Sequence, residues 1–116
     1  MDDLFLYLSG GLGVTVSIVH GYLGETRIVR PVVASSAAAK RVLSAIMFLS
    51  AVYWFCAGAL VLSAPTFFPG ATRSVIAFTA AGIFLSGALG NFWATRGRHF
   101  GWALLALCCG LAIAGA

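Results

Sequence analysis

Four stretches of the chain are apolar almost without interruption, and polar residues gather between them. The stretches run over 4–23, 42–64, 74–95 and 100–116. A helix needs about 20 apolar residues to cross a bilayer, and the fourth stretch lies near the lower limit. Backbone groups in lipid must find partners within their own segment, so each stretch is expected to be helical. The pattern predicts one all-α domain, residues 1–116, with four transmembrane helices in an up-down bundle.

Composition strengthens this interpretation. Of the 116 residues, 61% are hydrophobic and 9% are charged, and the mean hydropathy is +1.02. A soluble domain of this size needs more polar surface than that, so the bilayer is the expected partner of most of the surface. The first stretch begins with Asp2 and Asp3 and lacks a small-x-small cleavage site. We therefore expect a retained helix rather than a cleaved signal peptide.

The basic residues predict an orientation. Arg73 alone stands at the second connection. The other six of the seven basic residues fall in the first and third connections: Arg27, Arg30, Lys40, Arg41, Arg96 and Arg98. The positive-inside rule then places those connections in the cytoplasm and both termini on the periplasmic side. Topology explains the net charge of +4, and without a basic patch interleaved with aromatic residues we expect no nucleic-acid partner.

Small residues recur every four positions on two of the predicted helices. They are Ser9, Gly13, Ser17 and Gly21 on the first, and Gly82, Ser86 and Gly90 on the third. Such stripes let neighbouring helices approach closely. At 100° per residue His20 lies about 20° from Gly13 around the first helix, so its side chain is expected to face the packed side.

Local signals predict where the helices end. Gly24 is a candidate C-cap of the first helix, and Pro31 prevents its continuation. Ser35 or Ser36 can cap the second helix. Residues 65–70, Pro-Thr-Phe-Phe-Pro-Gly, are expected to form a tight turn.

The three cysteines argue against a disulfide framework. Cys56, Cys108 and Cys109 all lie within predicted helices, and the chain has no C-x-x-C motif. We expect them to pack as small apolar residues, with no thiolate metal site.

Six polar residues form the candidate site. In the predicted topology they share the cytoplasmic membrane level: His20, Glu25, Asn91, Arg96, Arg98 and His99. Ionisable groups within a membrane are costly, so they are candidates for function. His20 could be the single axial ligand of a haem or chlorophyll-type tetrapyrrole, it could relay protons with Glu25, or the basic rim could hold an anionic group. Aromatic residues at the centre of the second helix, Trp54 among them, suit either bundle packing or a flat partner molecule.

A purely structural interpretation explains the same residues. Glu25 could pair with Arg27, Arg96 or Arg98, while His20 and Asn91 tie the first and third helices together by hydrogen bonds. A metal site needs three or four ligands, and no second ligand stands at the right spacing from His20. The chain has no nucleophile–base pair, phosphate loop or paired carboxylates. We therefore expect neither an enzyme nor a resident metal, and no cofactor beyond the tetrapyrrole alternative.

Three places in the sequence resemble a family of small, uncharacterised four-helix proteins of the bacterial inner membrane. They are His20-Gly-Tyr-Leu-Gly-Glu25, the region of Trp54, and the segment 91–102 with its Thr95-Arg-Gly-Arg-His99-Phe-Gly-Trp102 run. The resemblance implies a multi-pass protein of the inner membrane and assigns no activity. Members of the family often carry a further histidine where this chain has Met47 and Phe48, so a two-histidine site is not expected here.

Two functions fit these patterns. The first is a non-catalytic accessory, structural or assembly subunit, packed against a larger membrane complex of respiratory or photosynthetic type. The second is a small homo-oligomeric transporter or channel for an ion or small solute. Four helices enclose little volume, so a pathway would need a dimer or more. Transporters usually bind their substrate near the midplane, where these helices lack ionisable residues.

Overall fold

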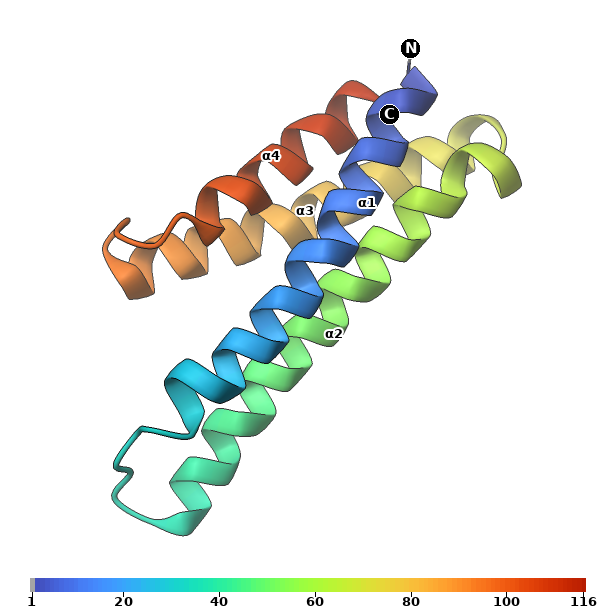
Figure 1. The fold of residues 1–116 in the computed structure, drawn as a ribbon. Helices are drawn as coiled ribbons and strands as arrows, with labels where there is room; N and C mark the ends of the chain where they lie inside the picture. Colours follow the sequence, from blue (N-terminus) through green and yellow to red (C-terminus); the bar gives the residue numbers. More distant parts are fainter. Residues whose placement is uncertain (1) are drawn as a thin grey trace.

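The computed structural model describes residues 2–116 and consists of helices joined by short connections (Figure 1). In chain order the elements are α1 (Asp2–Leu23), the π-helical turn η1 (Gly24–Val29), α2 (Ala37–Phe67), α3 (Gly70–Thr95) and α4 (Gly101–Ala114). Over these residues the fold is all-α with four α-helices, which confirms the fold class at that level. The side of the membrane on which the termini lie stays a prediction.

Three helical segments in the described part of the chain are long and apolar enough to cross a membrane. They are Asp2–Val29, Ala37–Phe67 and Gly70–Thr95. The fourth helix, α4, is apolar but short: its 14 residues rise only about 21 Å at 1.5 Å per residue. That is less than the hydrocarbon core of about 30 Å. Length and composition thus mark the chain as a multi-pass membrane protein with three full-length candidate spans and a shorter fourth helix.

The helices form two hairpins that diverge. The most extensive contact joins α1 to α2, the next joins α3 to α4, and the hairpins meet through α1 with α4 and α2 with α3. Both termini and the α2–α3 connection gather at one end of the molecule (Figure 1). The α1–α2 and α3–α4 connections point away from that end in different directions, so the molecule is elongated, at 50 × 25 × 17 Å.

Glycines set how closely the helices approach. A Cβ atom at Gly58 of α2 would lie 2.7 Å from the backbone nitrogen of Val14 and 3.0 Å from the carbonyl oxygen of Gly10. The backbones of α1 and α2 therefore touch at this crossing. Gly13 makes room for the fully buried ring of Phe84, since a Cβ there would lie 2.6 Å from that ring.

The α1–α4 contact contains a buried polar bond. The hydroxyl of Ser9, which is fully buried, donates a hydrogen bond of 2.8 Å to the backbone carbonyl of Cys108. Cys108 and Cys109 are buried and Cys56 is exposed, and all three are free thiols. The prediction that the cysteines pack as small apolar residues is confirmed for the α4 pair.

The first helix does not stop at Gly24 as predicted. It continues as the π-helical turn to Val29, and Arg30 N donates to Glu25 O at 3.0 Å. Gly24 is buried, and a Cβ there would collide with the Met47 side chain of α2. The glycine therefore serves close helix packing, and the helix ends one residue before Pro31, in agreement with the block expected from that proline.

The expected tight turn at 65–70 is also corrected. Helix α2 runs through Pro65 to Phe67, and Phe68 N donates to Ala64 O at 3.1 Å. Pro65 lacks an N–H, so one hydrogen bond of the last turns is lost, yet the next amide still closes a helical turn. The connection shrinks to Phe68 and Pro69.

The start of α2 follows the prediction. Ser36 is the N-cap, with extended backbone angles, and its hydroxyl accepts a hydrogen bond of 3.1 Å from Ala39 N. One of the free amides at the start of the helix is satisfied in this way.

Candidate functional site

His20 lies at the contact between α1 and α2. Its Nε2 is 3.1 Å from Ser50 Oγ, and Ser50 Oγ is 2.9 Å from the carbonyl oxygen of Met47. A hydroxyl has one hydrogen and a carbonyl can only accept, so Ser50 donates to Met47 and accepts from His20. This assigns the proton of the neutral imidazole to Nε2 and leaves Nδ1 with a lone pair.

Trp54 extends this contact to a third helix. Its ring centroid is 4.4 Å from that of His20, and the residue is only 6% exposed. Its other edge fills the space beside Gly87 of α3, where a Cβ atom would lie 2.7 Å from the indole. His20 and Trp54 therefore join α1, α2 and α3 at one junction, which we call the His20 junction: His20, Ser50, Trp54 and Gly87.

This junction replaces the expected hydrogen bonding of His20 and Asn91 between α1 and α3. The amide of Asn91 donates within its own helix to Gly87 O at 3.1 Å. The link from α1 to α3 is instead the indole ring of Trp54, contributed by the helix that lies between them. The prediction that His20 faces the packed side is confirmed.

Glu25 is held by neighbours on both sides. Ser44 of α2 donates to its Oε2 at 3.2 Å, and Arg30 Nε lies 3.9 Å from its Oε1. Residues five apart in an α-helix point about 140° away from each other, whereas the i to i+5 closure of a π turn stacks them. The π winding therefore selects Arg30 as the partner, in place of the expected Arg27, Arg96 or Arg98.

The α3–α4 connection is built by its own motif. Arg96 and Gly97 adopt left-handed angles, with φ of 52° and 73°. Gly97 N donates to Phe92 O at 2.9 Å, which closes the end of α3. The indole N–H of Trp102 then donates to Gly97 O at 3.2 Å. The sequence run from Thr95 to Trp102 thus has a structural role in making this turn.

The six candidate residues fall into two groups. His20 and Glu25 belong to the α1–α2 hairpin, and the others belong to the end of α3 and the turn that follows it. Within residues 2–116, no hydrogen bond or ion pair joins the two groups, and the hairpins that carry them diverge (Figure 1). His99 Nδ1 accepts from the amide of Gly101 at 3.1 Å and stacks on Phe100. The single polar layer that the sequence suggested is therefore divided.

Metal binding by several side chains has no support in the described residues, where no three His, Cys, Asp or Glu side chains gather. A tetrapyrrole needs one axial nitrogen, and His20 Nδ1 is the atom that could supply it. The tetrapyrrole alternative stays a prediction.

The two predicted small-residue stripes have opposite fates. Ser9, Gly13 and Ser17 are buried against other helices, and Gly21 is partly buried beside Ala51. The α3 stripe, Gly82, Ser86 and Gly90, is exposed. Among the described residues, nothing comes within 4 Å of a Cβ built at Gly82 or Gly90.

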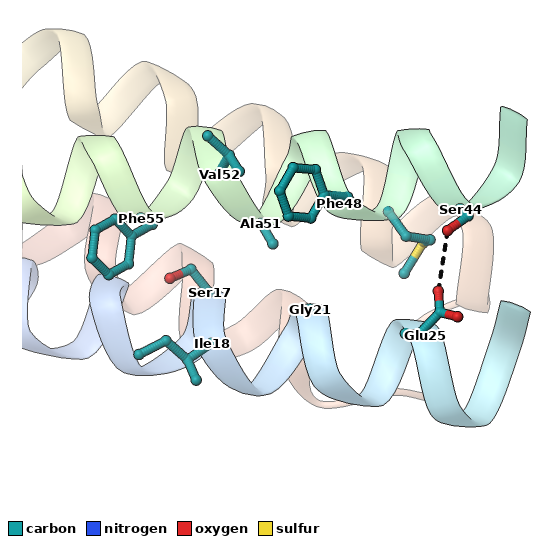
Figure 2. Close-up of a pocket in the computed structure, with 10 residues that line it drawn as sticks. Ser17, Ile18, Gly21, Glu25, Ser44, Phe48, Ala51, Val52 and Phe55 are labelled. Atoms are coloured by element: carbon teal, nitrogen blue, oxygen red, sulfur yellow. Dashed lines mark hydrogen bonds between the residues drawn. The ribbon is translucent and has the colours of Figure 1, made fainter. Parts of the chain in front are cut away.

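A groove between α1 and α2 was not anticipated from the sequence. It has a volume of about 550 Å³ and opens on the side away from α3 and α4, which lie behind it in Figure 2. Most of its wall is apolar, and the Glu25–Ser44 hydrogen bond closes one end (Figure 2). The sequence signal was present: Ser44, Phe48, Ala51 and Phe55 recur at helical spacing on one face of α2.

The fold and its contacts define the class of the protein at a coarse level: a small, all-α, multi-pass membrane protein whose polar side chains mostly join helix to helix. No family of known proteins, no curated protein and no solved structure matches this sequence.

Proposed function

We propose that the protein is a non-catalytic accessory, structural or assembly subunit that packs against a larger membrane complex of respiratory or photosynthetic type. The observation that carries the proposal is the exposed stripe of Gly82, Ser86 and Gly90 on α3. Small residues at four-residue spacing let a second helix approach closely in lipid. The same spacing on α1 is filled by neighbouring helices, so the α3 stripe has the chemistry of a helix contact and lacks the helix.

A second outward face on α4 supports the same proposal. Ala106, Gly110 and Ala114 follow the same spacing and are exposed. With α3 and α4 paired as a hairpin, the two faces would let one hairpin lie among several partner helices. The polar bonds that do exist, Ser9 with Cys108 and His20 with Ser50, join helices of this chain and fit a structural role.

We further propose a bacterial inner membrane with both termini on the periplasmic side. The distribution of basic residues supports this orientation. Arg73, the one basic residue at the opposite end, forms an ion pair with Asp3 and also donates to Gly115 O at 3.4 Å. Its charge is therefore neutralised at that end, which sharpens the contrast with the first and third connections. The resemblance to small four-helix inner-membrane proteins points to the same membrane.

The test is a mild-detergent pull-down of the tagged protein from its native membrane, followed by mass spectrometry and an absorption spectrum. We expect stoichiometric larger subunits with the native protein. The double variant Gly82→Leu/Gly90→Leu should lose them while it unfolds at the same temperature as the native protein. Gly11→Leu is the matched control, because it adds the same bulk on α1 where the described residues leave space.

Elution of the native protein alone, as a self-associated 12.0 kDa chain, would overturn the proposal. It would favour the alternative, a homo-oligomeric transporter or channel, in which a second copy covers the α3 stripe. Flux measurements in vesicles would then be the next experiment.

A further inference from the structure

The groove between α1 and α2 combines an apolar wall with one carboxylate. Ile18 and Phe48, 60% and 67% exposed, stand at its rim, and Val52 and Phe55 continue the wall toward the middle of α2. All four lie in front of the helix pair in Figure 2, with Glu25 at the far end. Since α1 and α2 have the length and composition of membrane spans, this face meets acyl chains rather than water.

The length of the groove suits a hydrocarbon chain. From Ser44 to Phe55, eleven residues along α2, the helix rises about 16 Å at 1.5 Å per residue. A linear chain lying along this line would cover the apolar wall and place its head beside Glu25. A partner helix would need a broader surface, and the groove is bounded by the rings of Phe48 and Phe55 (Figure 2).

Glu25 determines the charge of the head. Its carboxylate is 44% exposed and receives one hydrogen bond from Ser44, while Arg30 Nε stays 3.9 Å away. An ionised carboxylate can accept about four hydrogen bonds, so it can accept more from a ligand. A primary ammonium group fits because it is cationic and carries N–H donors, whereas a quaternary ammonium group lacks the donors.

A phosphate next to that ammonium would also find a partner. Arg41 precedes Ser44 by three residues, so it stands on the same face of α2, one turn nearer the connection. It is exposed. The sequence of groups along this face is thus a guanidinium, a carboxylate and an apolar trough, which mirrors a phosphate, an ammonium and an acyl chain.

We propose that the groove is a specific site for one molecule of a phospholipid with a primary-amine head group, of the phosphatidylethanolamine class. The ammonium binds Glu25, the phosphate lies toward Arg41, and one acyl chain follows the wall past Phe48 to Phe55. The site lies on the opposite side of the α1–α2 pair from α3, so it is independent of the proposed subunit contact.

The test is native mass spectrometry of the full-length protein in a mild detergent, with palmitoyl-oleoyl phosphatidylethanolamine, phosphatidylcholine or phosphatidylglycerol added at equal concentration. We expect one phosphatidylethanolamine adduct, at least about tenfold more abundant than the other two. Glu25→Gln keeps the shape of the side chain and should lower that adduct about tenfold, to the level of phosphatidylcholine. Asp2→Asn, which removes a carboxylate outside the groove, is the matched control and should leave the adduct unchanged.

A second variant tests the apolar part. Val52→Trp places bulk in the groove from a partly exposed position and should remove the adduct although Glu25 is intact. Equal retention of the three lipids by the native protein, or adducts that neither variant changes, would overturn the proposal. So would a concentration-dependent dimer that Val52→Trp dissociates, because it would assign the groove to a second copy of the chain.

Discussion

Two adjacent glycines on α1 should respond in opposite ways to the same substitution. A Cβ atom at Gly10 would lie 2.5 Å from Leu62 N and 2.7 Å from both Gly58 O and Leu62 Cα. These are backbone atoms, so no change of rotamer can relieve the contact. At Gly11 the described residues leave a Cβ atom free of neighbours within 4 Å. We predict that Gly10→Ala destabilises the protein and that Gly11→Ala does not.

The magnitude follows from two opposing effects. Extra bulk in a well-packed contact costs about 1–3 kcal/mol, and we expect the upper half of that range at Gly10 because α1 and α2 must move apart. Alanine is favoured over glycine inside a helix by up to about 1 kcal/mol, and this gain applies to both variants. Gly10→Ala should therefore lower the free energy of unfolding by about 1–2 kcal/mol. Gly11→Ala should leave it unchanged or raise it by up to about 1 kcal/mol.

Reversible unfolding in mixed micelles of dodecyl maltoside and dodecyl sulfate, followed by tryptophan fluorescence and circular dichroism, measures the difference. The native protein and the two variants would be compared at the dodecyl sulfate fraction of half unfolding. A Gly10→Ala variant as stable as Gly11→Ala would refute the close crossing of α1 and α2. Gly58→Ala, across the same contact, should behave as Gly10→Ala does.

Three further predictions concern local features. Ser36→Ala should weaken the start of α2 by about 1 kcal/mol, seen as roughly fivefold faster hydrogen exchange of the Ala39 amide; an unchanged rate would mean that the hydroxyl does not cap the helix. A cysteine at Ala37, in a variant whose native cysteines are replaced by alanine, should be labelled by a membrane-impermeant reagent from the cytoplasmic side alone, and periplasmic labelling would reverse the proposed orientation. His20→Ala should remove any visible absorption band that the purified protein carries, whereas a band of unchanged height would rule out His20 as its ligand.

The helices could be predicted from the sequence, but not all of their ends. Apolar runs of span length fix where helices form, because lipid leaves the backbone few alternatives. The two wrong ends share a cause: Gly24 and Pro65 usually mark the end of a helix, and here tertiary packing outweighed that preference. Gly24 lies against Met47, and the helix past Pro65 closes through the amide of Phe68.

The candidate site was predicted in its residues and not in its partners. The helical wheel gave the direction of His20 correctly, since direction depends on residue spacing alone. The contacts with Ser50 and Trp54 depend on which helix lies opposite and at what height, which a single sequence does not specify. The same reason explains why one small-residue stripe is filled and the stripe of α3 is not: period and composition are alike, and only the arrangement of the hairpins distinguishes them.

The unequal lengths of α2 and α4 have a consequence for the surrounding membrane. With 31 and 14 residues, they rise about 46 Å and about 21 Å. A bilayer in contact with both must be thick beside α2 and thin beside α4, and each ångström of such mismatch has a small elastic cost. The bilayer around the protein would therefore be graded in thickness. We expect the protein to be drawn to boundaries where thickness already changes, such as the rim of a larger complex, with its α4 side facing the thinner region.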